Sequence, residues 1–414
     1  MAYARSAGYT LVEDVALAEV VVVNTCTFIR EATGEAVDTI FDMAALKKDG
    51  CCKMLMVCGC FSQRYREQVA HEFPEVDVWC GVDDWENLFE AHLAPPVSTV
   101  RRHLSEPLAV QYLKIAEGCS HGCAFCIIPK VRGPFVSRAV TEIVSEARWL
   151  YEQGTRECIL VSQDTSYYGR DQKTNLVALL ETLLKKTAFP WLRLMYLHPQ
   201  QVTDELLRLI AAEPRICPYF DIPLQHASDA VLRRMKRTPG HAGLVSLIER
   251  IRTMVSDSAI RTSFITGFPG ERPADFKQLI RFVETMRFDK VGVFPYSAEE
   301  GTSAAILRPR VRGTTATRRC EELMTVQRDI SAELLAARVG RTLDVMIDRV
   351  SDEPAFAFTG RTRYDAPEVD GIVHIASGNC QVGTIVPLTI TAADDYDLYV
   401  GTASSAVRCS AITA

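Results

Sequence analysis

Six short apolar runs alternate with longer amphipathic stretches between Gln111 and Tyr296, and this alternation constrains the fold more than any other feature of the chain. The runs are Gln111–Ala116, Cys158–Ser162, Leu192–Leu197, Tyr219–Ile222, Arg261–Thr266 and Val291–Tyr296. Strands that alternate with helices form parallel sheets, because each helix returns the chain to the end where the previous strand began. The pattern therefore predicts a partial (β/α)6 barrel, whose chemistry lies in the loops after the strands.

Two further segments flank this core. Before it, Glu19–Cys26 and Lys53–Cys60 are apolar runs typical of parallel strands buried on both faces, and a helix is predicted after each. After it, a polar helix at 317–338 leads to short strands broken by Gly and Pro, which predict a small all-β barrel. We expect an α/β chain with an N-terminal domain at 1–98, a linker at 99–110, the core at 111–338, the β-barrel at 339–403 and a tail at 404–414.

Composition excludes several classes of protein. The chain has 414 residues, of which 48% are hydrophobic and 24% charged, so it can bury a large core. A net charge of −6 argues against a protein whose main task is to grip nucleic acid. We expect no membrane span, because no apolar stretch reaches about 18 residues. The chain lacks a secretory start, so its 14 cysteines indicate a reducing, cytoplasmic location with thiols kept free for metal.

Three of these cysteines, Cys119, Cys123 and Cys126, lie in one short loop after the first core strand. Thiolates at such close spacing select zinc or iron–sulfur clusters. A structural zinc normally takes four protein ligands, whereas three thiolates on a cubane cluster leave one iron open for a cofactor or substrate. The loop therefore favours a [4Fe–4S] cluster with one free position.

The C-x3-C-x2-C spacing, with Phe125 before the last cysteine, resembles the radical S-adenosylmethionine (SAM) enzymes. The whole chain is similar to the methylthiotransferases within that superfamily. This similarity is carried by NTCTFIREA, VCGCFSQRY, EGCSHGCAFCIIPKVRGPFVSR, GFPGE and GVFPYSAEEGTSA. The resemblance implies a radical SAM core followed by a C-terminal TRAM domain. It also implies that Cys119, Cys123 and Cys126 hold a [4Fe–4S] cluster that binds SAM, and that SAM then yields a radical able to take hydrogen from an unactivated carbon.

Other residues of the core are weaker candidates. Phe125, Gln163 and Arg261 are the candidate SAM contacts, since the first two lie in loops after strands and the third carries a guanidinium that suits a carboxylate. The alternatives are an N-cap role for the run Ser162–Ser166 and a surface salt bridge for Arg261. His198 and His226 lie at predicted strand ends and serve either in SAM or substrate contact or as hydrogen-bonded structure.

The resemblance implies a second [4Fe–4S] cluster in the N-terminal domain, with Cys26 and Cys60 as two of its three ligands. The third belongs to a strand and loop that the family has before the opening residues AYARSAGYTLVED, so this ligand is expected to be missing and a sheet edge exposed. Either the start was assigned too far downstream or the chain is short. Cys58 is an alternative third ligand, because it lies two residues before Cys60 on the same predicted strand.

The family has one branch that modifies tRNA adenosine and one that modifies an aspartate of a small-subunit ribosomal protein. The segments YFDIPLQHASDAVLRRMKR and RYDAPEVDG resemble the ribosomal-protein branch. Residues 340–400 independently favour a basic protein partner, because they hold ten acidic side chains against four arginines and no lysine. The resemblance implies an electron donor such as flavodoxin or ferredoxin. The alternatives are a tRNA methylthiotransferase and a degenerate protein that binds the ribosome without completing catalysis.

Overall fold

The structure is a computed structural model that describes residues 1–82, 102, 104, 108–378 and 380–401. The predicted tail at 404–414 lies outside the described residues, as does most of the predicted linker at 99–110. The chain divides into two compact units. The first consists of Met1–Leu104, Gly118–Pro134 and Ser297–Ile306, and the second of Ser105–Glu117, Phe135–Tyr296 and Leu307–Ala414.

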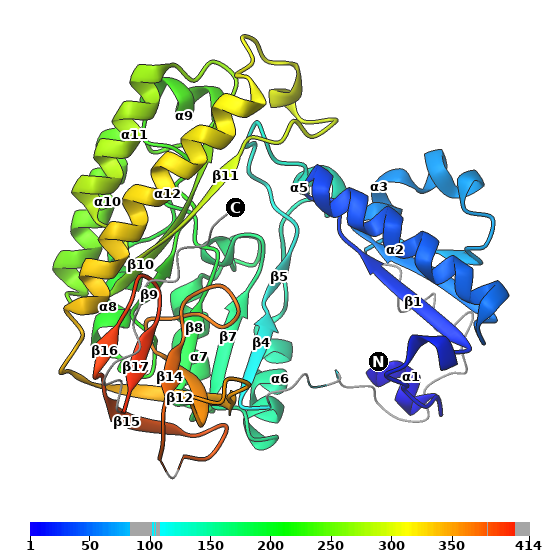
Figure 1. The fold of residues 1–414 in the computed structure, drawn as a ribbon, viewed down its shortest axis with the longest axis horizontal. Helices are drawn as coiled ribbons and strands as arrows, with labels where there is room; N and C mark the ends of the chain where they lie inside the picture. Colours follow the sequence, from blue (N-terminus) through cyan, green and yellow to red (C-terminus); the bar gives the residue numbers. More distant parts are fainter. Residues whose placement is uncertain (83–101, 103, 105–107, 379, 402–414) are drawn as a thin grey trace. The chain divides into compact units, whose positions relative to one another are not determined.

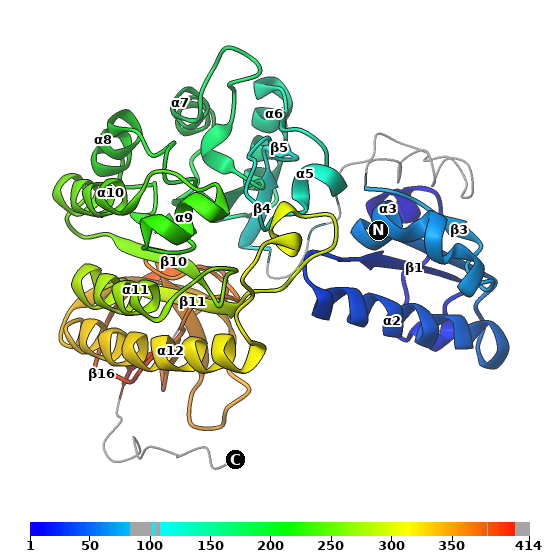
Figure 2. The ribbon, with the colours of Figure 1, turned by 90° about the horizontal axis from the view of Figure 1, so that it is seen from above.

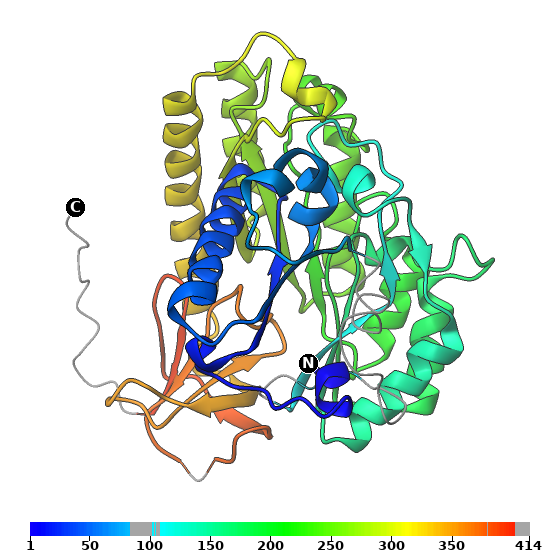
Figure 3. The ribbon, with the colours of Figure 1, turned by 90° about the vertical axis from the view of Figure 1, so that its right-hand side faces the viewer.

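The first unit is built on a three-stranded parallel sheet in the order β1-β2-β3. Its strands are β1 (Val20–Thr25), β2 (Met54–Gly59) and β3 (Val78–Trp79). Its helices are α1 (Ala2–Ser6), η1 (Val15–Leu17), α2 (Arg30–Asp49), α3 (Cys60–Val69), η2 (Ala70–Glu72), α5 (Ile128–Val131) and η4 (Ser303–Ile306). Ile40 of α2 packs in one core with Leu55 and Phe61, so this helix covers one face of the sheet (Figure 3).

β1 alternates between buried and exposed side chains, so the prediction that this run is buried on both faces is wrong. Val21 and Val23 face the core, whereas Val22 is 41% exposed. The exposed side opens into a hollow of about 1080 Å³ that Val20, Val22 and Asn24 help to line. β2 pairs with one edge of β1. Among the described residues, no strand pairs with the other edge of β1.

The second unit contains the six parallel strands that the sequence predicts, in two hydrogen-bonded groups of three (Figure 1). They are β4 (Val110–Lys114), β7 (Glu157–Val161), β8 (Trp191–Leu194), β9 (Tyr219–Asp221), β10 (Ala259–Thr266) and β11 (Lys290–Pro295). A parallel bridge between Leu192 and Ile216 joins the two groups. The prediction of a partial (β/α)6 barrel is confirmed.

Amphipathic helices cover the outside of these strands (Figure 2). They are α6 (Val140–Glu152), α7 (Leu176–Lys186), α8 (Asp204–Ala212), α9 (Asp229–Met235), α10 (His241–Met254), α11 (Pro273–Met286) and α12 (Gly313–Ala336), with η3 (Thr165–Tyr167) between β7 and α7. α7 shows why they form. Its N-cap Asn175 accepts a hydrogen bond from the Ala178 N–H, and four of its five leucines recur at helical spacing and are buried.

The C-terminal segment folds as a curled, mostly antiparallel sheet, as the sequence predicts. The strand order is β15-β12-β13-β14-β17-β16. The strands are β12 (Thr342–Val350), β13 (Phe358–Thr362), β14 (Val373–Ile375), β15 (Ile385–Thr389), β16 (Ala392–Ala393) and β17 (Leu398–Val400). Val345 and Val373 share a core with Val110 and Tyr219 of the barrel, so the two parts pack as one body.

A buried charge cluster reinforces this packing. Glu157 of β7 binds Arg193 of β8 at 2.6 Å and Arg361 of β13 at 2.8 Å, and Arg361 also binds Asp348 at 2.8 Å. Burial alone disfavours the charged form of Glu157, but the two guanidinium groups outweigh burial and hold its pKa below its usual range. The barrel and the C-terminal sheet therefore satisfy each other's buried charges.

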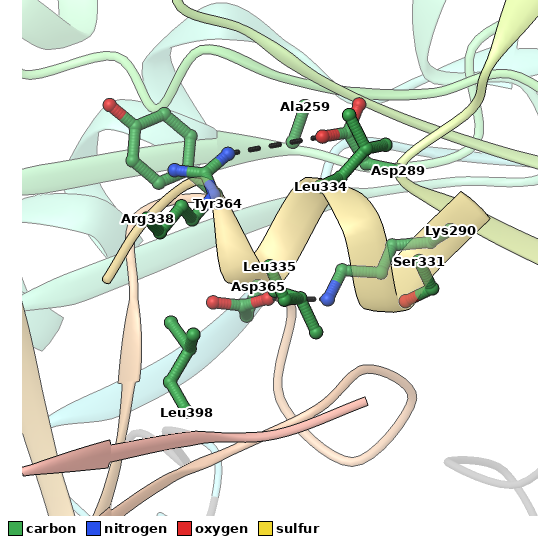
Figure 4. A pocket seen from close by; sticks show the side chains of 10 residues that line it. All are labelled: Ala259, Asp289, Lys290, Ser331, Leu334, Leu335, Arg338, Tyr364, Asp365 and Leu398. Atoms are coloured by element: carbon green, nitrogen blue, oxygen red, sulfur yellow. Dashed lines mark ion pairs between the residues drawn. The ribbon is translucent and has the colours of Figure 1, made fainter. Parts of the chain in front are cut away.

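A second group of ion pairs lies where α12 meets the C-terminal sheet (Figure 4). Lys290 binds Asp365 at 2.7 Å, and Arg338 lies 3.8 Å from Asp289 and over the ring of Tyr364. These side chains surround a cavity of only about 10 Å³. Asp365 is thus committed to an internal pair, and not all of the acidic side chains of this segment contribute to its surface charge.

In the described part of the chain, no helix is both long enough and apolar enough to cross a membrane.

Candidate functional site

The loop that carries Cys119, Cys123 and Cys126 is closed at its base by a two-stranded antiparallel ribbon. β5 (Ala116–Glu117) pairs with β6 (Val136–Ser137), so the chain leaves and returns at one point. Inside the loop, the Cys119 N–H donates to the Gly133 carbonyl at 3.2 Å, and the Cys126 N–H donates to the Cys123 carbonyl at 3.2 Å. Cys119 is buried, and the other two thiols are half-buried. A short ordered loop therefore presents all three thiols.

Gly118 is required at the start of this loop. Its φ of +76° lies in the left-handed region, and a Cβ at this position would lie 2.1 Å from the Pro134 carbonyl oxygen. Any side chain would push apart the two ends of the loop. The position of the cysteines thus depends on a residue with no side chain.

The donor set fits an iron–sulfur cluster better than a single ion. Among the described residues, no group of three His, Cys, Asp or Glu side chains is arranged to hold one metal ion. A cubane asks for a different arrangement, because each of its thiolate ligands binds a different iron atom. Three soft thiolates in one loop are the kind of donor set that such a cluster takes when one iron is left open.

Gln163 lies at the end of β7, in the loop where the barrel is expected to bind its ligand. Its Nε2 donates to Glu117 Oε1 at 2.9 Å, and Glu117 immediately precedes the cysteine loop. Its Oε1 and the neighbouring Ser162 Oγ are buried, and neither has a hydrogen-bond partner in the described structure. Buried polar atoms normally have partners, so this pair of acceptors suits a bound ligand. Phe125 is half-buried within the cysteine loop.

Arg261 binds two carboxylates within the second unit. Its Nη1 binds Asp221 at 2.8 Å, and its Nε lies 3.5 Å from Asp370 of the C-terminal segment. Both carboxylates are almost completely buried. These two partners outweigh burial and raise the pKa of Arg261. The guanidinium therefore neutralises charges at the contact between the barrel and the C-terminal sheet.

Both candidate histidines are buried, and each takes part in local hydrogen bonds. His226 Nδ1 accepts from the Ser228 N–H at 2.9 Å, and burial lowers the pKa of His226 to about 3. Its Nε2 lies 4.0 Å from Glu271 and has no hydrogen-bond partner among the residues that the structure describes. His198 Nδ1 accepts from the Gln200 N–H at 3.3 Å. His226 is therefore a neutral imidazole, and these hydrogen bonds tie each ring to the backbone of its own loop.

Cys26 and Cys60 lie at the same edge of the N-terminal sheet. Thr25 is in register with Gly59, and the two cysteines are the residues that follow this pair on neighbouring strands. Gly59 has a φ of +95°, and a Cβ there would lie 2.5 Å from the Thr25 carbonyl oxygen. The Thr25 hydroxyl completes the junction by donating to the Cys58 carbonyl and accepting from the Phe61 N–H. The register of the sheet thus brings two residues far apart in sequence to neighbouring backbone positions, where Cys26 is exposed and Cys60 is buried.

The strand argument for Cys58 fails, because β2 ends at Gly59 and Cys60 is the first residue of α3. The two cysteines therefore do not share a strand face. Cys58 packs with Met56 and Cys80, whereas Cys60 packs with Ile127 and Val131. Burial, and to a lesser degree the neighbouring Cys80, raises the pKa of the Cys58 thiol to about 11. Cys58 thus belongs to a different apolar cluster from Cys60.

Two arginines that sequence reasoning missed join these loops within the first unit. Arg132 Nη2 donates to Cys60 Sγ at 3.3 Å. Arg64 of α3 donates to the carbonyls of Thr27 and Glu300 at 3.2 and 2.8 Å. For Arg132, the sequence offered one local signal, its position directly after the cysteine loop. Its partner Cys60 lies 72 residues away, so the contact itself could not be predicted from the local sequence.

The six-stranded barrel and its three-cysteine loop define a radical SAM enzyme. The Radical SAM superfamily model matches residues 113–283, the Uncharacterized protein family UPF0004 model matches 1–81, and the TRAM domain model matches 339–402. Among solved structures, the radical SAM methyltransferase TsrM from Kitasatospora setae is similar, with a TM-score of 0.53 and 15% identity over 71% of this chain and 67% of that chain. This likeness concerns the fold alone.

Curated relatives narrow the class. Proteins named ribosomal protein uS12 methylthiotransferase RimO are 42% identical in Citrifermentans bemidjiense, over 96% of this chain and 93% of the relative. The relative of that name from Sorangium cellulosum is 43% identical to this chain, over 95% of this chain and 85% of the relative. The one from Clostridioides difficile is 40% identical, over 96% of this chain and 93% of the relative. The chain belongs to the RimO family of methylthiotransferases.

Proposed function

We propose that this protein places a methylthio group on the β-carbon of an aspartate in small-subunit ribosomal protein uS12. The observation that carries the proposal is the loop of Cys119, Cys123 and Cys126, held in shape by Gly118, in a chain that matches RimO relatives over nearly its full length. A methylene C–H lies far outside the range in which a side-chain base can act, so the reaction needs a cofactor for hydrogen abstraction.

We assign Cys119, Cys123 and Cys126 to a [4Fe–4S] cluster and Cys26 and Cys60 to a second one, for which a third ligand remains to be identified. When bound, the first cluster and SAM supply the one-electron chemistry. The protein's own groups position the reactants. Gln163 Oε1 and Ser162 Oγ are available to accept hydrogen bonds from SAM, and Phe125 to contact it.

We assign Arg261 to the junction between barrel and TRAM domain and not to SAM, because it binds two buried carboxylates. We propose that residues 1–98, 111–338 and 339–403 are the three functional domains of the protein. The compact units differ from it, because the cysteine loop and residues 297–306 group with the N-terminal sheet.

The substrate proposed is a basic ribosomal protein. Exposed acids of the TRAM domain such as Asp344 and Glu353 favour a basic partner over a phosphate backbone. We further propose a flavodoxin or ferredoxin as electron donor and a cytoplasmic location, where ribosomes are modified.

The test is a reconstituted reaction. Protein loaded with iron and sulfide is incubated with SAM, a reductant, a sulfur source and purified uS12, and uS12 is then analysed by mass spectrometry. The expected product carries one methylthio group on a single aspartate. The Cys119→Ala variant should give none. Modified tRNA with unmodified uS12 would overturn the proposal in favour of the tRNA branch, and SAM cleavage without transfer to either would favour a degenerate enzyme.

A further inference from the structure

Tyr196 follows β8 at the carboxyl end of the barrel strands, and its backbone has a conformation that tyrosine rarely adopts. Its φ of +59° lies in the left-handed region. Among the six described non-glycine residues with positive φ, it is the one aromatic residue. A bulky side chain in this region is strained and persists only where the surroundings hold it, and such residues gather at binding and catalytic sites. The strain at Tyr196 therefore calls for a functional explanation.

Hydrogen bonds hold this conformation on both sides of the residue. The Tyr196 N–H donates to Asp221 Oδ2 at 3.0 Å, and the Tyr196 carbonyl accepts from the Thr165 N–H at 3.0 Å. Asp221 is completely buried and binds Arg261, which also lies 3.5 Å from Asp370 of the TRAM domain. The backbone of Tyr196 is thus fixed between the loop after β7 and the contact of the barrel with the TRAM domain.

Tyr196 is also accessible, unlike its neighbours in the chain. The residue is 44% exposed, whereas Met195 and Leu197 are at most 3% exposed. Its backbone N–H and carbonyl are both engaged, so the ring is the part of the residue left to bind a ligand. The loop that holds its carbonyl also carries Ser162 and Gln163, whose buried acceptors suit a bound ligand.

The charges near the Tyr196 hydroxyl separate the ring from the candidate SAM acceptors. Burial and, to a lesser degree, the charge of Asp221 raise the pKa of Tyr196, while Arg261 acts in the opposite direction. The hydroxyl therefore lies near the groups that join the barrel to the TRAM domain. Gln163, by comparison, donates to Glu117 beside the cysteine loop. This separation favours the protein substrate over SAM as the partner of Tyr196.

We propose that Tyr196 is a substrate-contacting residue, whose ring packs against the segment of the basic protein uS12 that carries the target aspartate. The inference rests on the proposed function, because it assumes that substrate. Aromatic rings attract the cationic side chains of lysine and arginine, and tyrosines are frequent among the residues that dominate binding at protein interfaces. A ring on a fixed backbone loses little freedom when it binds. The strained backbone thus holds the ring in one place before the substrate arrives.

The experiment uses the reconstituted full-length protein and purified uS12. Isothermal titration calorimetry measures uS12 binding, and mass spectrometry measures methylthio transfer at varied concentrations of uS12 and SAM. Tyr196→Asn removes the ring but keeps a residue that tolerates the left-handed region, so the variant should fold and retain its iron. It should bind uS12 about tenfold more weakly and raise the KM for uS12 by a similar factor, with the KM for SAM unchanged. Tyr196→Phe, which keeps the ring, should restore most of the affinity.

Two further variants complete the design. Tyr396→Asn is the matched control, because Tyr396 is 47% exposed in the turn between β16 and β17, and this variant should bind uS12 like the unaltered protein. Tyr196→Gly gives the same comparison should Tyr196→Asn lose iron, because glycine adopts the left-handed region without strain.

The outcomes separate this inference from the proposed function. If the unaltered protein neither binds nor modifies uS12, the proposed function falls and the inference falls with it. If the unaltered protein modifies uS12 and Tyr196→Asn equals it in affinity and KM, only the inference is overturned. A raised KM for SAM with unchanged uS12 binding would also overturn the inference, since the ring would then serve SAM. An equal loss of affinity in Tyr396→Asn would overturn it as well, because the effect would not be specific to Tyr196.

Discussion

The two sets of cysteines differ in how the chain brings them together. Cys119, Cys123 and Cys126 lie within eight residues of sequence, in a loop closed by its own ribbon. Cys26 and Cys60 come from the ends of two neighbouring strands and depend on Gly59, Thr25 and the register of the sheet. A local set needs only its loop, whereas a non-local set needs the fold of a whole sheet. The first set should therefore tolerate changes elsewhere better than the second.

The largest expected effect separates the two sets by chemistry. Cys123→Ala removes a ligand of the SAM cluster, so production of 5′-deoxyadenosine should fall to the level without enzyme. Chromatography of the reaction mixture measures it. Cys51→Ala, which removes an exposed cysteine of the first unit, is the control and should leave the rate unchanged. Persistent SAM cleavage by Cys123→Ala would remove this loop from the catalytic assignment.

Loss of a cysteine from the second set should affect methylthio transfer but not SAM cleavage. Cys60→Ala should keep SAM cleavage but lose the methylthio product, and its iron content should fall by about the share of one cluster. Cys58→Ala is the matched control, because Cys58 packs with Met56 and Cys80 and away from Cys60. If Cys58→Ala loses iron as Cys60→Ala does, Cys58 is a ligand of the second cluster after all.

A substitution in the buried charge cluster of the second unit should change activity less than those above but should lower stability strongly. Glu157→Gln leaves Arg193 and Arg361 buried with less compensation, so the free energy of unfolding should fall by about 3–5 kcal/mol. Chemical denaturation measures the change. Iron content at low temperature should stay unchanged, because both cysteine sets belong to the first unit. An unaltered unfolding midpoint would show that the buried cluster contributes little.

The sequence predicts the barrel closely because its strands and helices are local patterns. All six predicted strands are present, with ends shifted by a few residues at most, as for Arg261–Thr266 against β10 (Ala259–Thr266). The cysteine loop is predictable for the same reason. By contrast, the exposure of Val22 depends on what covers β1, which the run of valines does not encode.

The parts that sequence reasoning missed are contacts between distant residues. Arg361 meets Glu157 across 204 residues of sequence, and Arg132 meets Cys60 across 72. Arg261 shows the same limit, since its guanidinium suits a cofactor carboxylate as well as the side chains of Asp221 and Asp370 that it binds. Side-chain chemistry alone does not select among carboxylates, and only the three-dimensional arrangement does.

The charge cluster of Glu157, Arg193 and Arg361 also limits how this protein can be recombined with others. The TRAM domain forms a separate module in the sequence. In this structure, however, Glu157 belongs to the barrel, and Arg361, which helps to neutralise it, belongs to the TRAM domain. A TRAM domain grafted from a protein without a basic residue at the position of Arg361 would leave Glu157 with one partner in place of two. Exchange of this domain between enzymes therefore requires that barrel and module change together.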